Sequence, residues 1–156
     1  MNRFSWYKRL NMKNDDLIIR KTFNCSKRQL FDAWSKASIM AQWFFAASEK
    51  FKNSTVESNF TVNGKFSVKM YFENGTDSQI TGHYKEIIRY SLIVLTWNSS
   101  IARDSLVKLN FKEISPNRTE LVLVQSLFPS EESRQAHNNG WDACLANLTR
   151  FIDSVY

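Results

Sequence analysis

The chain has 156 residues, 43% of them hydrophobic and 14% aromatic, and a formal net charge of +6. This length and apolar content suit one domain with a sizeable core, and no apolar run approaches the roughly 18 residues of a membrane span. The basic residues are spread along the chain and no recognition motif accompanies them, so nucleic-acid binding is not expected.

The two cysteines, Cys25 and Cys144, are far apart in the sequence and form no CxxC pair. Two lone cysteines indicate packed thiols in a reducing compartment rather than a disulfide framework or a zinc site. The first 16 residues also lack the apolar region of a signal peptide. The expected location is therefore the cytoplasm.

Residues 1–16 are predicted to be an N-terminal extension to a single domain that spans residues 17–156. Basic and apolar residues alternate in the extension. This alternation suits either a frayed tail or a short amphipathic helix that docks on the domain or touches a membrane surface. The domain itself opens with a predicted strand at 17–23, because LIIRKTF is rich in β-branched residues.

Two short helices are predicted after this strand. Ser26, followed three residues later by Gln29, has the spacing of a capping box and predicts a helix start. Ser35 is expected to cap a second helix over KASIMAQWFF (36–45). The buried side of that second helix is predicted to hold Ile39, Met40, Trp43 and Phe44.

An antiparallel run of strands follows, because apolar residues then recur at every second position. The segments are 65–73, 79–88, 91–97 and 105–113, and Asn74-Gly75 predicts a hairpin turn between the first two. On 79–88 the alternation places Tyr84, Glu86 and Ile88 inward and His83 outward. TELVLVQS (119–126) is apolar on both faces, which predicts a covered central strand.

The last predicted element is a long amphipathic helix after Pro129-Ser130. At 100° per residue, His137, Trp141, Cys144, Leu148 and Val155 fall close to one line, which is expected to be buried. Gly140 lies beside this line and is expected either to let the helix approach the sheet or to leave room for a ligand. The whole order predicts an α+β helix-grip fold: a curved antiparallel sheet around a long C-terminal helix, with two short helices.

Three segments resemble one known family. FDAWSKASIMAQWF (31–44), GHYKEIIRYSLIVLTW (82–97) and HNNGWDACLANL (137–148) are similar to the homologues of the activator of heat-shock protein 90 ATPase, within the START/Bet v 1-like (SRPBCC) superfamily. The resemblance covers about residues 17–153. It implies a hydrophobic cavity between the sheet and the last helix, since superfamily members bind lipids, sterols, polyketides or other apolar molecules.

The resemblance also implies a co-chaperone role, because eukaryotic namesakes carry a related domain. Those proteins have a separate N-terminal chaperone-binding domain as well. In these 156 residues we expect no such second domain, and therefore not the co-chaperone role of those proteins.

The candidate site consists of inward-facing residues of the predicted sheet and helices. The predicted ligand-binding residues are Trp43, Phe66, Met70, Tyr84, Glu86, Trp97, Leu109, His137 and Trp141. Aromatic residues would form the walls, and Glu86 and His137 would orient a polar end of the ligand. The alternative is that the same residues fill an ordinary core.

Two further functions compete with ligand binding. One is a cyclase or hydrolase that uses Glu86 and His137 as acid and base. The other is a protein-interaction role, with a chaperone whose ATPase it regulates or with a second copy in a homodimer. The sequence contains no nucleophile, phosphate-binding or dinucleotide motif and no metal-ligand spacing, so no cofactor and no metal are expected and an enzyme is the less favoured class.

Overall fold

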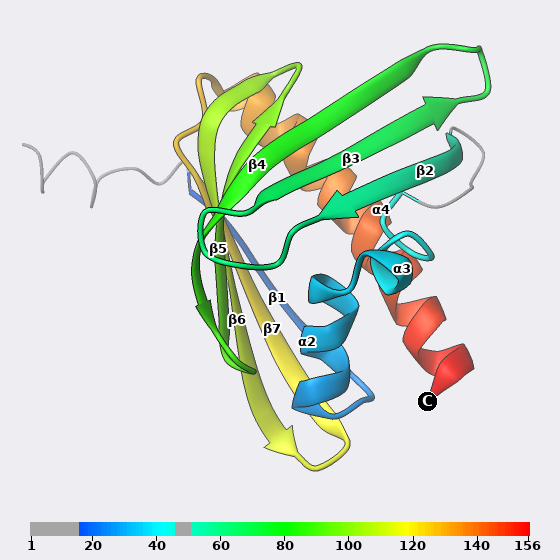
Figure 1. Cartoon of the computed structure of the whole chain (residues 1–156), viewed down its shortest axis with the longest axis vertical. Coiled ribbons are helices and arrows are strands. Elements are labelled where there is room, and N and C mark those ends of the chain that lie inside the picture. Colours follow the sequence, from blue (N-terminus) through cyan, green and yellow to red (C-terminus); the bar gives the residue numbers. More distant parts are fainter. Residues whose placement is uncertain (1–15, 46–50) are drawn as a thin grey trace, which may run out of the picture.

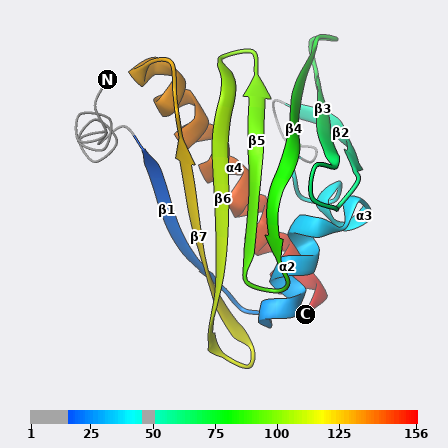
Figure 2. The ribbon, with the colours of Figure 1, turned by 60° about the vertical axis from the view of Figure 1, so that its left-hand side comes forward.

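The computed structural model describes residues 16–45 and 51–156, and residues 51–53 by their backbone alone (Figure 1). In this part of the chain seven antiparallel strands form one sheet in the order β1-β7-β6-β5-β4-β3-β2 (Figure 2). The strands are β1 (Leu17–Phe23), β2 (Phe51–Ser58), β3 (Lys65–Phe72), β4 (Asp77–Ile88), β5 (Leu92–Ser99), β6 (Ala102–Ser115) and β7 (Arg118–Ser126). The predicted α+β helix-grip fold is confirmed. Of the predicted extension, only Asp16 falls among the described residues.

The long helix α4 (Glu131–Val155) crosses one face of the curved sheet diagonally (Figures 1 and 2). Its start is fixed by Ser130, whose side chain accepts a hydrogen bond from the Ser133 backbone N–H. The predicted stripe is buried from His137 through Leu148, whereas Val155 at the end of the helix is 53% exposed. The helix therefore covers the sheet with one continuous apolar face.

The helices α2 (Lys27–Ser35) and α3 (Ala37–Met40) cover the lower end of the same face (Figure 1). The capping box at Ser26 and Gln29 is confirmed by both of its hydrogen bonds. The predicted cap at Ser35 is wrong. Lys36 stands at that position instead, and its side chain makes no capping bond. Only Lys36 separates the two helices, so Ser35 is the last residue of α2 and is not available as the cap of α3.

Two strands differ from the prediction. The β2 strand was not predicted, because its sequence FKNSTVES has few apolar residues at alternate positions. The β7 strand is second from the sheet edge rather than central, and its burial alternates along its length. Val122 and Val124 on its outer side are half-buried. The prediction of a central strand covered on both faces is therefore wrong.

A β-bulge in β4 changes which residues face the helix. Tyr84 pairs with Leu95, but Glu86 pairs with Val94, so one extra residue lies between them on β4. Because side chains alternate along a strand, this single insertion exchanges the two faces beyond Tyr84. Glu86 is exposed, and Ile88 is 49% exposed. The prediction that both residues face inward is therefore wrong.

Candidate functional site

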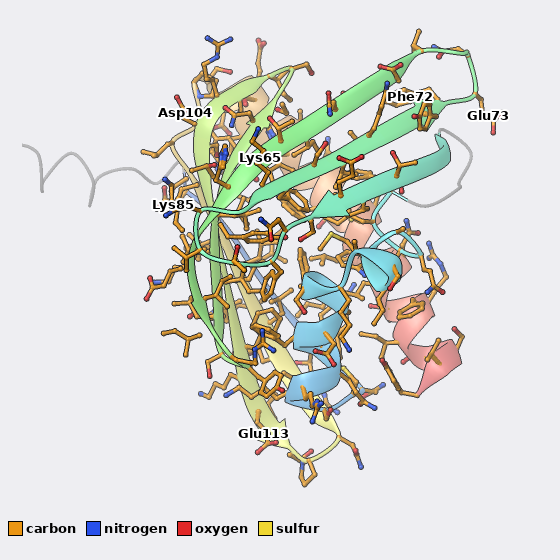
Figure 3. All side chains as sticks on the ribbon, viewed as in Figure 1. Lys65, Phe72, Glu73, Lys85, Asp104 and Glu113 are labelled. Carbon is orange, nitrogen blue, oxygen red and sulfur yellow. The ribbon has the colours of Figure 1, made fainter. Side chains whose placement is uncertain are left out.

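A cavity of about 270 Å³ lies between the first half of α4 and the inner face of strands β3, β4 and β5. The residues around it are mostly apolar or aromatic, with a few uncharged polar groups. They are Phe45, Met70, Phe72, Ser78, Ile80, Trp97, Ser99, Ser100, Ile101, Ala136, His137, Gly140 and Trp141. Figure 3 shows Phe72 at the far end of β3, which is the outer limit of this wall.

The sheet wall follows from strand alternation and register. Met70 on β3 pairs with Ser78 on β4, so both belong to one row across the sheet. On β5, Trp97 is 3% exposed and its ring centre lies 5.0 Å from that of Trp141 on α4. The two indoles therefore join the sheet wall to the helix wall.

His137 supplies the main polar group of the cavity. Its Nδ1 lies 2.7 Å from the Ser133 carbonyl oxygen, and its Nε2 lies 3.3 Å from Ser99 Oγ. A carbonyl oxygen only accepts, so Nδ1 carries the proton and Nε2 of the neutral ring is an acceptor. Burial lowers the pKa of His137 below its ordinary value. The imidazole is therefore neutral near pH 7, with its lone pair toward Ser99.

A buried chain of hydrogen bonds fixes the orientation of Trp141. Its Nε1–H donates to Gln125 Oε1 at 2.7 Å, and Gln125 Nε2 donates to Ser105 Oγ at 3.1 Å. Ser105 Oγ in turn donates to the Ser126 carbonyl oxygen at 2.7 Å. Gln125 and Ser105 are both fully buried, so no water competes for these bonds. These three hydrogen bonds hold the Trp141 ring in its place at the cavity wall.

Beyond Trp141 the interior is filled. The gap there has a volume of about 10 Å³, and Phe66, Tyr84 and Leu109 border it. Tyr84 Oη lies 2.7 Å from Ser58 Oγ, and burial raises the pKa of Tyr84 to about 12. Trp43 is fully buried and donates its Nε1–H to the Ala33 carbonyl oxygen at 3.1 Å.

The structure thus divides the nine predicted site residues. Met70, Trp97, His137 and Trp141 border the cavity. Phe66, Tyr84 and Leu109 border the small gap, and Trp43 borders neither. Glu86 is exposed on the outer side of β4, next to Lys85, which lies away from α4 in Figure 3. The acid–base pair of Glu86 with His137 is therefore not formed.

Sequence reasoning missed several cavity residues. Ser99, Ser100 and Ile101 form the tight β5–β6 turn, where the reading of strand alternation stopped. Phe45 has a φ of 48°, a region that bulky side chains rarely adopt, and its position could not be read from periodicity. The polar run Asn98-Ser99-Ser100 after the inward Trp97 was the one available signal.

The glycine in α4 leaves space rather than allowing a close backbone approach. A Cβ on Gly140 would lie 3.7 Å from the nearest atom of the Phe45 ring, which is ordinary van der Waals contact. Of the two readings of Gly140, the structure favours room beside the cavity.

Other kinds of site find little support in the described residues. Across residues 16–45 and 51–156, no three His, Cys, Asp or Glu side chains are grouped as metal ligands. Burial raises the pKa of the Cys25 thiol to about 11 and that of the Cys144 thiol further, so neither is an activated nucleophile. No helix in the described part of the chain is long and apolar enough to cross a membrane.

A seven-stranded sheet, a long helix across it and a cavity between them define a helix-grip, START-like protein. Residues 24–153 match the family described as "Activator of Hsp90 ATPase homolog 1-like protein", and the chain belongs to that family. No curated protein sequence matches the chain.

Solved structures show the same fold at low sequence identity. A protein from Rhodobacter sphaeroides aligns with a TM-score of 0.76 and 18% identity, over 90% of this chain and 93% of that one. A family protein from Silicibacter pomeroyi aligns with a TM-score of 0.74 and 17% identity, over 90% and 99%. A protein from Chromobacterium violaceum aligns with a TM-score of 0.75 and 15% identity, over 88% and 96%. At these identities the likeness is one of fold.

Proposed function

We propose that this protein binds a small apolar or amphipathic molecule in the cavity between the sheet and α4. The observation that carries the proposal is the cavity itself, about 270 Å³ in volume and bordered mainly by aromatic and aliphatic side chains. Ligand sites are concave and mostly apolar, with a few polar groups that fix orientation. His137 and Ser99 are those polar groups here.

The size of the cavity limits the ligand. A cavity of about 150 Å³ accommodates one benzene, so this one suits roughly ten to twelve non-hydrogen atoms. That is the size of a bicyclic aromatic or of a short aliphatic chain. A longer amphipathic molecule would leave its remaining part at the mouth, beside Ile101 and Ala136, which are both exposed.

Binding without a reaction is the function we favour. Among the described residues that border the cavity there is no carboxylate and no thiol, and none of them is an acidic partner for His137. We place the protein in the cytoplasm, because its two thiols, Cys25 and Cys144, are free and buried. The alternative is a protein-interaction role, with a chaperone or with a second copy of this chain as the partner. Binding experiments on the isolated protein distinguish that role from ligand binding.

The first experiment is native mass spectrometry of the protein purified from its own cells, followed by denaturing extraction. We expect a defined small molecule that is released on denaturation. If the protein is purified without a ligand and also fails to bind 2-methylnaphthalene in a calorimetric titration, the proposal is overturned and the interaction role is favoured.

A pair of substitutions on α4 ties binding to the cavity. Ala136 borders the cavity at its exposed mouth, whereas Asn139 is exposed on the same helix and does not border it. Ala136→Trp should weaken 2-methylnaphthalene binding at least tenfold by filling the mouth, and Asn139→Trp should leave binding unchanged. Both variants should stay within about 1 kcal/mol of the parent in unfolding free energy, since both sites are exposed. Equal binding by the two variants would place the ligand elsewhere.

A further inference from the structure

The described side chains around the cavity carry no charge that could balance an ionised ligand. Each described side chain that borders the cavity is uncharged, since His137 is the single titratable group among them and its ring is neutral. A carboxylate or ammonium group placed there would be desolvated without a partner, which is costly. The part of the ligand inside the cavity is therefore uncharged.

One polar atom of the cavity can accept a stronger hydrogen bond than it has. His137 Nδ1–H is held by the Ser133 carbonyl at 2.7 Å, so the ring cannot change its tautomer without losing that bond. Its Nε2 is engaged by Ser99 Oγ at 3.3 Å, which is long for an O–H donor. Ser99 Oγ also accepts a hydrogen bond from the Ile101 backbone N–H at 3.3 Å. A better donor from a ligand would displace the serine at little cost.

A buried hydrogen-bond donor near His137, the indole N–H of Trp97, lacks a partner among the described residues. Trp97 is 3% exposed, and its Nε1–H is buried with no hydrogen-bond partner. Its ring centre lies 6.4 Å from that of His137, and both side chains border the cavity. The Trp97 Nε1 atom is enclosed on all sides, so a ligand in the cavity does not reach it in this structure. His137 Nε2 is therefore the ring nitrogen that a ligand in the cavity can engage.

We propose that the cavity selects flat, uncharged molecules that carry a hydroxyl group, of which a naphthol is the simplest. The hydroxyl donates to His137 Nε2, which accepts at present only the long bond from Ser99 Oγ. The aromatic body lies between the sheet wall and Trp141. This inference rests on the proposed function, and it goes further by naming the chemical class and the atom that recognises it.

The test compares two probes of equal size that differ in the hydroxyl group. Binding of 2-naphthol and of 2-methylnaphthalene is measured by equilibrium dialysis at pH 7.5, with the parent protein and with His137→Phe. We expect His137→Phe to weaken 2-naphthol binding three- to tenfold more than it weakens 2-methylnaphthalene binding, which is the range for one net hydrogen bond. For each probe, the dissociation constant of His137→Phe is divided by that of the parent, and the two quotients are then compared. This comparison removes the difference in hydrophobicity between the probes.

Two further variants complete the design. His83, the other histidine, is exposed on the outer side of β4, so His83→Phe is the matched control and should change neither affinity. Ser99→Ala removes the competing hydroxyl and should strengthen 2-naphthol binding without affecting 2-methylnaphthalene. If His137→Phe does not fold, the Ser99→Ala result decides alone, because an unchanged preference there contradicts the acceptor role of His137.

The outcomes separate this inference from the proposed function. If the parent protein binds neither probe, ligand binding in the cavity is itself overturned. If it binds both probes and His137→Phe weakens them equally, the cavity binds ligands but does not recognise a hydroxyl. Binding of 2-naphthoate as tight as that of 2-naphthol would overturn the exclusion of charge.

Discussion

The two ends of the space between sheet and helix are built from the same kinds of residue but packed differently. At the end covered by α2 and α3, the rings of Trp34, Trp43 and Phe44 pack together at steep angles, with ring centres 4.7–6.3 Å apart, and leave a gap of about 10 Å³. At the end near the start of α4, the interior opens to about 270 Å³. Trp97 and Trp141 border both spaces and form the partition.

The difference shows that aromatic residues on a buried face do not by themselves distinguish a core from a binding site. Covering elements make the distinction. The helix α2 brings Trp34 into the interior at one end, and the turn after α3 brings Trp43 there, whereas α4 presents Ala136 and Gly140 at the other end. Small residues on the covering helix leave volume that the facing strands do not fill.

Truncation should therefore cost most at the filled end. Trp43→Ala removes a fully buried ring that contacts two other rings, and we expect a loss of roughly 3–5 kcal/mol in unfolding free energy. Met70→Ala removes a side chain that already borders the cavity, so fewer contacts are lost and we expect about 2 kcal/mol. Urea denaturation measures both. Equal losses would mean that the cavity is closed in solution.

Glycine substitutions probe the same contrast with opposite signs. A Cβ on Gly82 in β4 would lie 1.9 Å from the Thr96 carbonyl oxygen, a backbone atom that cannot move aside, so Gly82→Ala should cost on the order of 1–3 kcal/mol. A Cβ on Gly140 meets only the Phe45 ring at 3.7 Å. Gly140→Ala should therefore stabilise the protein by up to about 1 kcal/mol through helix propensity. Thermal unfolding of the two variants checks both signs, and destabilisation by Gly140→Ala would show that the helix sits closer to Phe45.

Much of the fold could be predicted from the sequence because its signals are local. The β-branched run gives β1 with its observed bounds, Ser26 and Gln29 start α2, and Ser130 starts α4. The apolar spacing of α4 also placed His137 and Trp141 on the buried face. These features depend on residues a few positions apart, where backbone hydrogen bonding and side-chain periodicity act directly.

The site could be predicted only in part, because it depends on distant contacts. One bulge residue in β4 turned Glu86 outward, and strand periodicity carries no signal for such an insertion. Whether Tyr84 or Met70 borders the cavity depends on how far α3 and α4 lie from the sheet, and both residues share the same alternation. Sequence pattern assigns a face, whereas volume comes from the fit of elements that are far apart in the chain.

The smallest expected effect is a pH dependence that belongs to the open end alone. Burial lowers the pKa of His137 in the folded protein, so the unfolded chain takes up the proton first as the pH falls. Stability should therefore be full above the ordinary histidine pKa of about 6.5 and decrease as the pH falls from there to the lowered folded value. Urea denaturation at pH 7.5 and pH 5.0 should show that His137→Phe loses less stability between the two pH values than the parent does. His83→Gln should behave like the parent, because that side chain is exposed. If His137→Phe and the parent lose the same amount, the imidazole is solvated in solution, and the cavity is wetter at its mouth than the aromatic walls imply.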